Sequence, residues 1–203
     1  MEAYNIAIMR EYASGGALIG KKLAEDIGLN FYDKEAIQIV AKQNGLSAEY
    51  VESIGQRRGF FFYDTYGFTG DLPMPEQIFI AESNAIKELA KTGSSVFVGR
   101  NAGYVLRDDE NIINIFIHAP IEWRIALARE KYNLKDVSDI RDYIEKQDKS
   151  RRYYNRFFTN QKWGKPQDYN LTIDSSIGIE ASTEVIREYV EKFLKTKDGS
   201  FVA

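Results

Sequence analysis

Five arginines stand where an α/β protein could bind an anion. Arg10 and Arg100 come at the ends of short apolar runs, and Arg151, Arg152 and Arg156 lie in one basic segment. Guanidinium groups keep their charge and donate hydrogen bonds in a planar fork that matches phosphate oxygens. A small polyanion such as a nucleoside triphosphate is therefore one candidate ligand. For the basic segment, a solvated helix face and a nucleic-acid contact are the alternatives.

The first arginine precedes a turn that contains two glycines. Ile6 to Met9 indicate a buried strand, the turn follows, and apolar residues then recur at helical spacing up to Gly28. A strand, a glycine turn and a helix N-terminus direct free backbone N–H groups at one point, where an anion binds well. The candidate phosphate-binding loop comprises Arg10, Ser14, Gly15, Gly16 and Ala17.

This loop departs from the phosphate-binding sequence G-x-x-x-x-G-K-[ST]. Its lysine position falls on Gly16, and its hydroxyl position falls on an aliphatic residue. Arg10 and Ser14 are the substitutes that remain, and Ser14 is the one candidate for a magnesium contact. A strand-to-helix turn without any ligand is the alternative interpretation.

Polar residues also follow two later strands. Asp33 comes after the second short apolar run, and Arg100 and Asn101 come after the run 95–98. In a parallel sheet these residues share the carboxyl edge, where open α/β sheets bind ligands. Asp33 also suits the N-cap of a helix over 34–44, and the two roles are compatible.

The alternation of apolar runs predicts an α/β fold. We expect a mostly parallel sheet of about five strands with helices on both faces and the first strand inside the sheet. The expected strands are 6–9, 29–32, 95–98, 112–117 and 169–174, and the expected later helices are 34–44, 47–54, 75–92, 120–132, 139–158 and 179–194. Residues 59–75 carry many aromatics without a period, so they could line a pocket or a partner surface, or fold inward. We interpret His118 as structural.

Bulk composition excludes several classes of protein. The 203 residues are 44% hydrophobic, enough for one domain, and the net charge of -3 gives no basic field for nucleic acid. Without cysteine and with one histidine, thiolate chemistry and multi-histidine metal sites are excluded. No signal peptide or membrane-spanning run is evident, so we expect a cytoplasmic protein with no membrane contact.

Several segments together resemble one family. The opening segment IAIMREYASGGALIGKKLAEDIGLNFYDKEAI is similar to that of the cytidylate kinase-like family, relatives of the P-loop nucleoside monophosphate kinases with an R-E-[YF]-x-S-G-G loop. FVGRNAGYVLR resembles the family's G-R-[DN] acceptor segment. PIEWRIALA, DKSRRYYNRFF and DYNLTIDSS resemble its helix after the fourth strand, its arginine-bearing lid and its closing strand. The resemblance covers nearly the whole chain.

The resemblance implies a three-layer α/β/α P-loop kinase-like fold in one domain, 1–203. Its core would be 1–33, 93–134 and 168–195, its acceptor-binding excursion 34–92 and its lid 135–165. It implies ATP and Mg²⁺, with γ-phosphoryl transfer to a nucleoside monophosphate such as CMP or dCMP, or to another small acceptor. Small nucleotides would be its partners.

The resemblance also assigns roles to residues. Asp33, Arg100 and Asn101 would contact the acceptor, although Asn101 offers an amide where a carboxylate is common. Arg152 and Arg156, with Arg151, would neutralise the transferring phosphoryl group.

We further expect Arg152 and Arg156 on one face of a mobile helix directed at the cleft between Ser14 and Arg100. Little apolar surface in that segment could hold it in place.

A catalytically inactive nucleotide-binding or regulatory protein with the same fold is the alternative, favoured by the loop. A dinucleotide-dependent oxidoreductase is disfavoured because no G-x-G-x-x-G follows the first strand.

Overall fold

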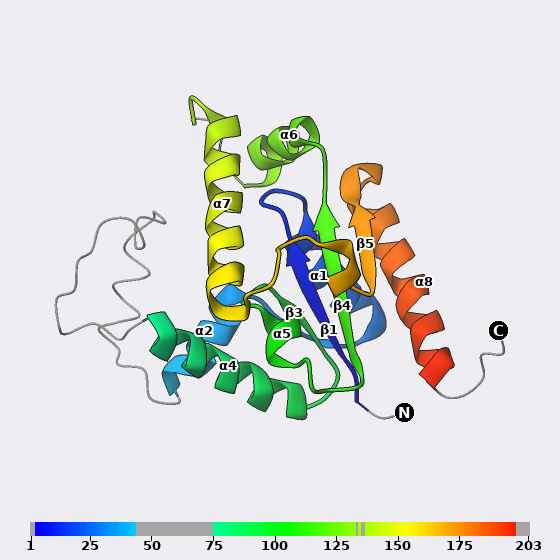
Figure 1. Cartoon of the computed structure of the whole chain (residues 1–203). Helices are drawn as coiled ribbons and strands as arrows, with labels where there is room; N and C mark the ends of the chain where they lie inside the picture. Colours follow the sequence, from blue (N-terminus) through cyan, green and yellow to red (C-terminus); the bar gives the residue numbers. More distant parts are fainter. Residues whose placement is uncertain (1–2, 44–74, 133, 135–136, 198–203) are drawn as a thin grey trace.

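One parallel sheet organises the molecule, of which the computed structural model describes residues 3–43, 75–132, 134 and 137–197. The strand order is β2-β3-β1-β4-β5, and all four pairings are parallel. The strands are β1 (Asn5–Arg10), β2 (Asn30–Tyr32), β3 (Ser95–Val98), β4 (Ile112–His118) and β5 (Leu171–Asp174). The first strand is central, as predicted, and the carboxyl ends share the upper edge in Figure 1.

Helices connect the strands and form two layers around the sheet. They are α1 (Gly16–Ile27), α2 (Lys34–Gln43), α4 (Pro75–Lys91), α5 (Ala102–Val105), α6 (Ile121–Lys131), α7 (Ile140–Thr159) and α8 (Ile179–Lys197). This confirms the predicted α/β fold. The short α5 and the 3₁₀ turns Pro166–Asp168 and Ser175–Ile177 were not anticipated. The expected helix over 47–54 and almost all of the aromatic stretch 59–75 lie outside the described residues.

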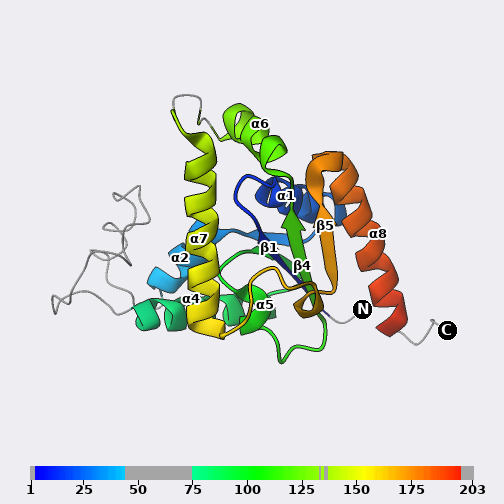
Figure 2. The ribbon, with the colours of Figure 1, turned by 45° about the horizontal axis from the view of Figure 1, so that its top comes forward.

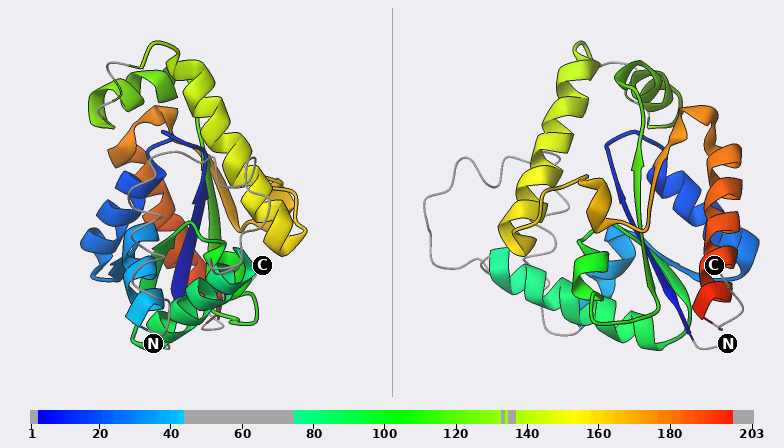
Figure 3. Two further views of the ribbon diagram at one scale, coloured as in Figure 1. Left: turned by 90° about the vertical axis from the view of Figure 1, so that its left-hand side faces the viewer. Right: turned by 45° about the vertical axis from the view of Figure 1, so that its right-hand side comes forward.

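The core lies on both faces of the central strands. Ile6 and Ile8 of β1 face α1 and α8, where they join the isoleucines of β4. Ala7 faces the opposite way and packs with Phe97, α2, α4 and α5. Burial on both faces explains why these strands are continuous apolar runs rather than alternating ones. Figure 3 shows α1 on one side of the sheet and α7 on the other.

A third apolar cluster closes the carboxyl edge. Ala13 of the β1–α1 loop packs with Ala128 of α6 and with Ile140 and Ile144 of α7. In Figure 2 the loop lies between α7 on one side and β5 on the other, beneath α6. This cluster fixes the upper half of α7 over the loop. Within the described residues, no helix has the length and apolar composition needed to cross a membrane.

Candidate functional site

The loop between β1 and α1 is held by its own buried serine. Ser14 is fully buried, and its hydroxyl donates to the carbonyl oxygens of Glu11 at 2.9 Å and Ile117 at 3.3 Å. Its backbone N–H donates to Glu11 O at 3.4 Å. Gly15 has φ 77°, and a Cβ there would collide with Ile179 Cδ1. The first hydrogen bond within the helix runs from Ile19 N to Gly15 O. The N–H groups at the start of α1, before Ile19, are therefore free to bind a ligand.

Arg10 occupies the space that the missing lysine would need. A Cβ on Gly16 would lie 2.7 Å from Arg10 Cβ and 2.8 Å from Arg10 Cγ, so the arginine stem lies directly over this glycine. Its guanidinium reaches Gly99 after β3, where a Cβ would collide with Arg10 Nη1. Two glycines thus frame the arginine, and the cation is supplied from the first position of the loop instead of the seventh.

Arg10 belongs to a group of cations. Burial first, and then the positive charges of Arg151 and Arg100, lower the pKa of Arg10 to about 9. Arg151 donates from Nη1 to Arg10 O at 2.9 Å and lies over the Tyr12 ring, 5.2 Å from its centroid. No carboxylate of the described chain lies within ion-pair distance of Arg10. Burial and the neighbouring positive charges therefore destabilise the charged form of Arg10 at neutral pH, and a bound anion would relieve this destabilisation.

The β3 end carries backbone strain beside this group. Gly99, Arg100 and Asn101 have φ of 87°, 53° and 54°, three successive left-handed residues of which two are not glycine. Such strain concentrates at functional sites because only a constrained surrounding structure maintains it. Arg100 Nε lies 3.3 Å from Glu82 Oε1, and its guanidinium is 5.5 Å from the Tyr154 ring centroid. Burial lowers the pKa of Arg100, but Glu82 and Tyr154 outweigh it, so the pKa is raised.

Asn101 faces a small polar cavity. Its Oδ1 accepts from Asn155 Nδ2 at 3.2 Å, whereas Asn101 Nδ2 and Asn155 Oδ1 have no hydrogen-bond partner. The cavity has a volume of about 100 Å³ and lies between β1, α5 and the end of α7, with Gly99 at one side. Other polar side chains in its wall are Tyr104, Arg107, Asn114, Gln161, Asp168 and Tyr169. Asp33 caps α2 by accepting from Ala36 N at 3.0 Å, which confirms one of its two predicted roles.

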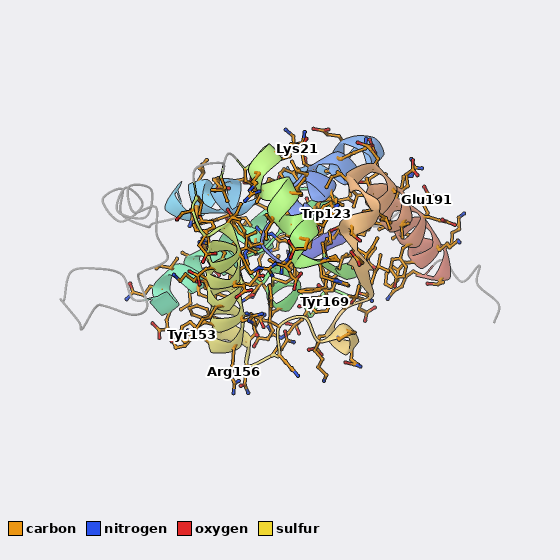
Figure 4. All side chains as sticks on the ribbon, turned by 90° about the horizontal axis from the view of Figure 1, so that it is seen from above. Lys21, Trp123, Tyr153, Arg156, Tyr169 and Glu191 are labelled. Atoms are coloured by element: carbon orange, nitrogen blue, oxygen red, sulfur yellow. The ribbon has the colours of Figure 1, made fainter. Side chains whose placement is uncertain are left out.

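The orientation of α7 differs from the expectation. Its inward row contains Asp148, Arg151 and Asn155, whereas Arg152 and Arg156 are exposed. Arg152 lies over the Trp163 ring at 5.5 Å, and Arg156 points away from the molecule in Figure 4. The expectation that these two arginines face the cleft is therefore wrong in this arrangement. The face of α7 that is turned to the cleft carries other polar residues, and Arg152 and Arg156 lie outside it.

Apolar contacts also hold α7 more firmly than expected. Besides the buried Ile140 and Ile144 at its start, Phe158 near its end stacks on Phe79 of α4 with centroids 4.3 Å apart. The expectation of little apolar surface is therefore wrong.

Several residues of this site were missed from the sequence. Arg124 is 8% exposed, pairs with Asp148 Oδ2 at 2.5 Å and donates to Tyr12 O at 3.2 Å. Asp148 Oδ1 accepts from Tyr12 N at 2.6 Å, so this pair ties α6 and α7 to the loop. Glu82 was missed as well. Charged residues in amphipathic helices are normally solvated, so no sequence signal distinguished these three.

Comparisons with known proteins agree with this geometry. Residues 5–177 match the sequence profile of the cytidylate kinase-like family. The crystal structure of an uncharacterized protein from Eubacterium ventriosum ATCC 27560 shares 29% identity and a TM-score of 0.72, over 94% of this chain and 99% of that chain. No curated protein sequence matches the chain.

Two kinases share the fold at low identity. A shikimate kinase from Bacteroides thetaiotaomicron is 13% identical with a TM-score of 0.56, over 94% of this chain and 99% of that chain. A gluconokinase from Sinorhizobium meliloti 1021 is 11% identical with a TM-score of 0.60, over 98% of each chain. These two neighbours show a P-loop kinase fold. With the profile matched over most of its length, the chain belongs to the cytidylate kinase-like family.

Proposed function

We propose that the protein transfers the γ-phosphoryl group of ATP to a nucleoside monophosphate of the CMP or dCMP kind, or to another small acceptor. The observation that carries this proposal is Arg10, a half-buried cation with no carboxylate of the described residues within ion-pair distance, placed over Gly16 at the start of α1. An active P-loop needs a cation at this point, and Arg10 supplies one where lysine is missing. Family membership supports the same reaction class.

The residues fit the phosphates of ATP. The first N–H groups of α1, with Gly16 and Ala17, would bind phosphate oxygens, and Arg10 and Arg151 would neutralise their charge. Phosphoryl transfer needs mainly positioning and charge stabilisation, which these groups provide without covalent chemistry. Of the three arginines expected to neutralise the transferring group, Arg151 would act without α7 moving, whereas Arg152 and Arg156 would reach the phosphates only after α7 had rotated.

Magnesium fits the described residues less well. The Ser14 hydroxyl is buried and already donates to two backbone carbonyls. Within the described residues, no group of three or more His, Asp or Glu side chains could hold a metal ion. When bound, magnesium would supply charge neutralisation to the phosphates, and we assign it no protein ligand.

The acceptor would bind beside the donor phosphates. Arg100 would pair with its anionic group, and Asp33 and Asn101 would contact its remainder, with the cavity beside Asn101 available to a small polar group. Residues 34–92 and 135–165 would then act as acceptor-binding and lid segments of one domain, 1–203.

A coupled assay tests the proposal. ATP is offered with CMP, dCMP, UMP and AMP, and with shikimate and gluconate as acceptors that lack phosphate. We expect transfer to at least one nucleotide and its loss in Arg10→Gln, with Lys21→Gln, an exposed change on α1, as the control.

Transfer to none of these acceptors would contradict the proposal. If calorimetry nevertheless showed ATP binding that depends on Arg10, the second candidate would hold: a nucleotide-binding regulatory protein. The complete burial of Ser14, which keeps its hydroxyl away from a magnesium ion, favours that candidate.

A further inference from the structure

A buried carboxylate joins the acceptor side of the site to α7. Glu82 of α4 is 1% exposed, and its Oε1 is 3.2 Å from Gln38 Nε2 of α2. Its Oε2 accepts from the Tyr154 hydroxyl of α7 at 3.0 Å, and Arg100 completes the group through Nε. Figure 1 shows the lower end of α7 meeting α4 and α2 at this place. One side chain thus contacts α2, α7 and the turn after β3 at the proposed acceptor site.

The hydrogen bonds in this group are unequally shared. Gln38 and Tyr154 each donate to one oxygen of Glu82. Arg100 is close enough for charge pairing at 3.3 Å, yet its buried Nε has no hydrogen-bond partner. An arginine normally closes a two-point pair with a carboxylate when both oxygens are available. Here each oxygen already accepts from a neutral donor, Arg100 approaches Glu82 through Nε without a hydrogen bond, and that Nε keeps its hydrogen-bonding capacity.

We propose that Glu82 and Tyr154 are positioning residues through which α7 controls Arg100. With α7 docked, Tyr154 occupies Glu82 and leaves the Arg100 guanidinium for the anionic group of the acceptor. When α7 moves away, the freed Glu82 oxygen takes Arg100 into a two-point pair and withdraws it. The inference rests on the proposed function only in giving Arg100 an anionic ligand.

The physical basis is the cost of an unsatisfied buried acceptor. A buried carboxylate oxygen that loses its donor is strongly driven to find another, and Arg100 is the nearest cation. Acceptor binding and α7 docking therefore favour each other. A bound acceptor keeps Arg100 from Glu82 and leaves Glu82 for Tyr154, and docked Tyr154 keeps Glu82 from Arg100. An acceptor would be held only when the phosphate loop is covered by the same helix.

The test measures anion binding directly at Arg100. The full chain, labelled with ¹⁵N, is titrated with inorganic phosphate while the Arg100 Nε–H resonance is followed; Arg100→Gln identifies that resonance. We expect Tyr154→Phe to weaken phosphate binding about two- to tenfold, the range of one hydrogen bond. Glu82→Gln should tighten binding, because the competing charge is removed. In the Glu82→Gln background, Tyr154→Phe should have no effect beyond about twofold.

Two further variants serve as a control and as an independent check of the test. Tyr153→Phe makes the same chemical change one residue away on an outward side chain, and it should leave phosphate binding unchanged. Gln38→Ala frees the other Glu82 oxygen, so it should weaken binding as Tyr154→Phe does, even if Glu82→Gln fails to fold.

Two results would overturn the inference while leaving the proposed function intact. One is weaker phosphate binding in Glu82→Gln, which would make Glu82 a support of Arg100 instead of a competitor. The other is an equal effect of Tyr154→Phe in both backgrounds. An Arg100 resonance that never responds to phosphate, together with active transfer in the coupled assay, would also remove this inference alone.

Discussion

Arg10 and Gly16 are complementary substitutions within one loop. The arginine stem fills the volume above Gly16 that a lysine Cβ would enter, and its guanidinium continues to Gly99. A loop of this shape can carry its cation either as an arginine at position 10 or as a lysine at position 16. It has no room for both side chains, because a Cβ at position 16 would overlap the Arg10 stem. The absence of the usual lysine is then not in itself a sign of lost activity.

Because the side chains at positions 10 and 16 compete for one space, exchanging them has a predictable effect on stability. Gly16→Lys alone should lower the free energy of unfolding by about 1–3 kcal/mol, because its Cβ overpacks against Arg10. Arg10→Gly combined with Gly16→Lys should recover much of that stability and restore ATP binding, measured by thermal unfolding and calorimetry. A double variant no better than Gly16→Lys would show that the two positions are not complementary.

Two arginines of the site should respond oppositely to removal. Arg10→Met deletes a cation that has no carboxylate partner among the described residues, so we expect a gain of about 1 kcal/mol in the free energy of unfolding. Arg124→Met leaves Asp148 buried and unpaired, so we expect a loss of about 3–5 kcal/mol. Urea unfolding measures both. Equal losses in the two variants would mean that Arg10 also serves mainly to hold the fold.

At the scale of elements, α7 shows where sequence patterns fail. Its length and its N-cap at Asp139 follow from the sequence, and Asp139 Oδ1 accepts from Asp142 N at 3.0 Å. Its inward face does not follow, since Asp148 and Asn155 are buried while aromatic Phe157 is 49% exposed. Helical periodicity assigns the buried face to apolar residues, and this helix reverses that assignment where it crosses a polar site.

The orientation of α7 predicts different effects for its arginines. Arg151→Ala should reduce turnover at least about tenfold, because Arg151 lies beside Arg10 and its charge would act on the transferring group. Arg152→Ala and Arg156→Ala should change turnover less than about threefold, as surface changes usually do. Steady-state kinetics of the three variants measures these changes in turnover. A large loss in Arg156→Ala would require α7 to rotate during the reaction cycle.

More of the fold than of the site followed from the sequence. Strands such as Ser95–Val98 were found at their bounds because continuous apolar runs have few alternative structures. Arg10, Arg100 and Asn101 were found because strand ends fix their place at the sheet edge. Glu82 was missed because burial of a charge depends on partners distant in sequence. The closing strand was expected from Tyr169 but starts at Leu171, because the Tyr169 N–H still bonds to Pro166 O of the preceding 3₁₀ turn.

For the whole molecule, contributions to the site come from every layer. β1 supplies Arg10, the turn after β3 supplies Arg100, α6 supplies Arg124, and α7 supplies Asp148 and Arg151. Helices α6 and α7 meet the paired strands at the carboxyl edge, so a ligand bound there contacts both the sheet and the helices above it. Ligand binding should therefore stabilise distant parts of the chain together.

Hydrogen exchange tests this coupling. A non-hydrolysable ATP analogue should slow amide exchange in the β1–α1 loop and along α7, because both would be tied to the same phosphates. The last turns of α8, far from the carboxyl edge, should exchange at an unchanged rate and provide the internal control. Protection confined to the loop would show that α7 does not take part in binding.

The central position of β1 has a consequence for how the protein is made. Asn5 pairs with Ser95 and with Ile112, so the first strand must wait for partners 90 and 107 residues further along the chain. At about 5–20 residues per second, a ribosome needs roughly 5–20 s to reach them. During that interval the apolar run of β1 leaves the ribosome without a sheet to join. The β1 segment of the nascent chain then depends on chaperone protection until β3 and β4 have been translated.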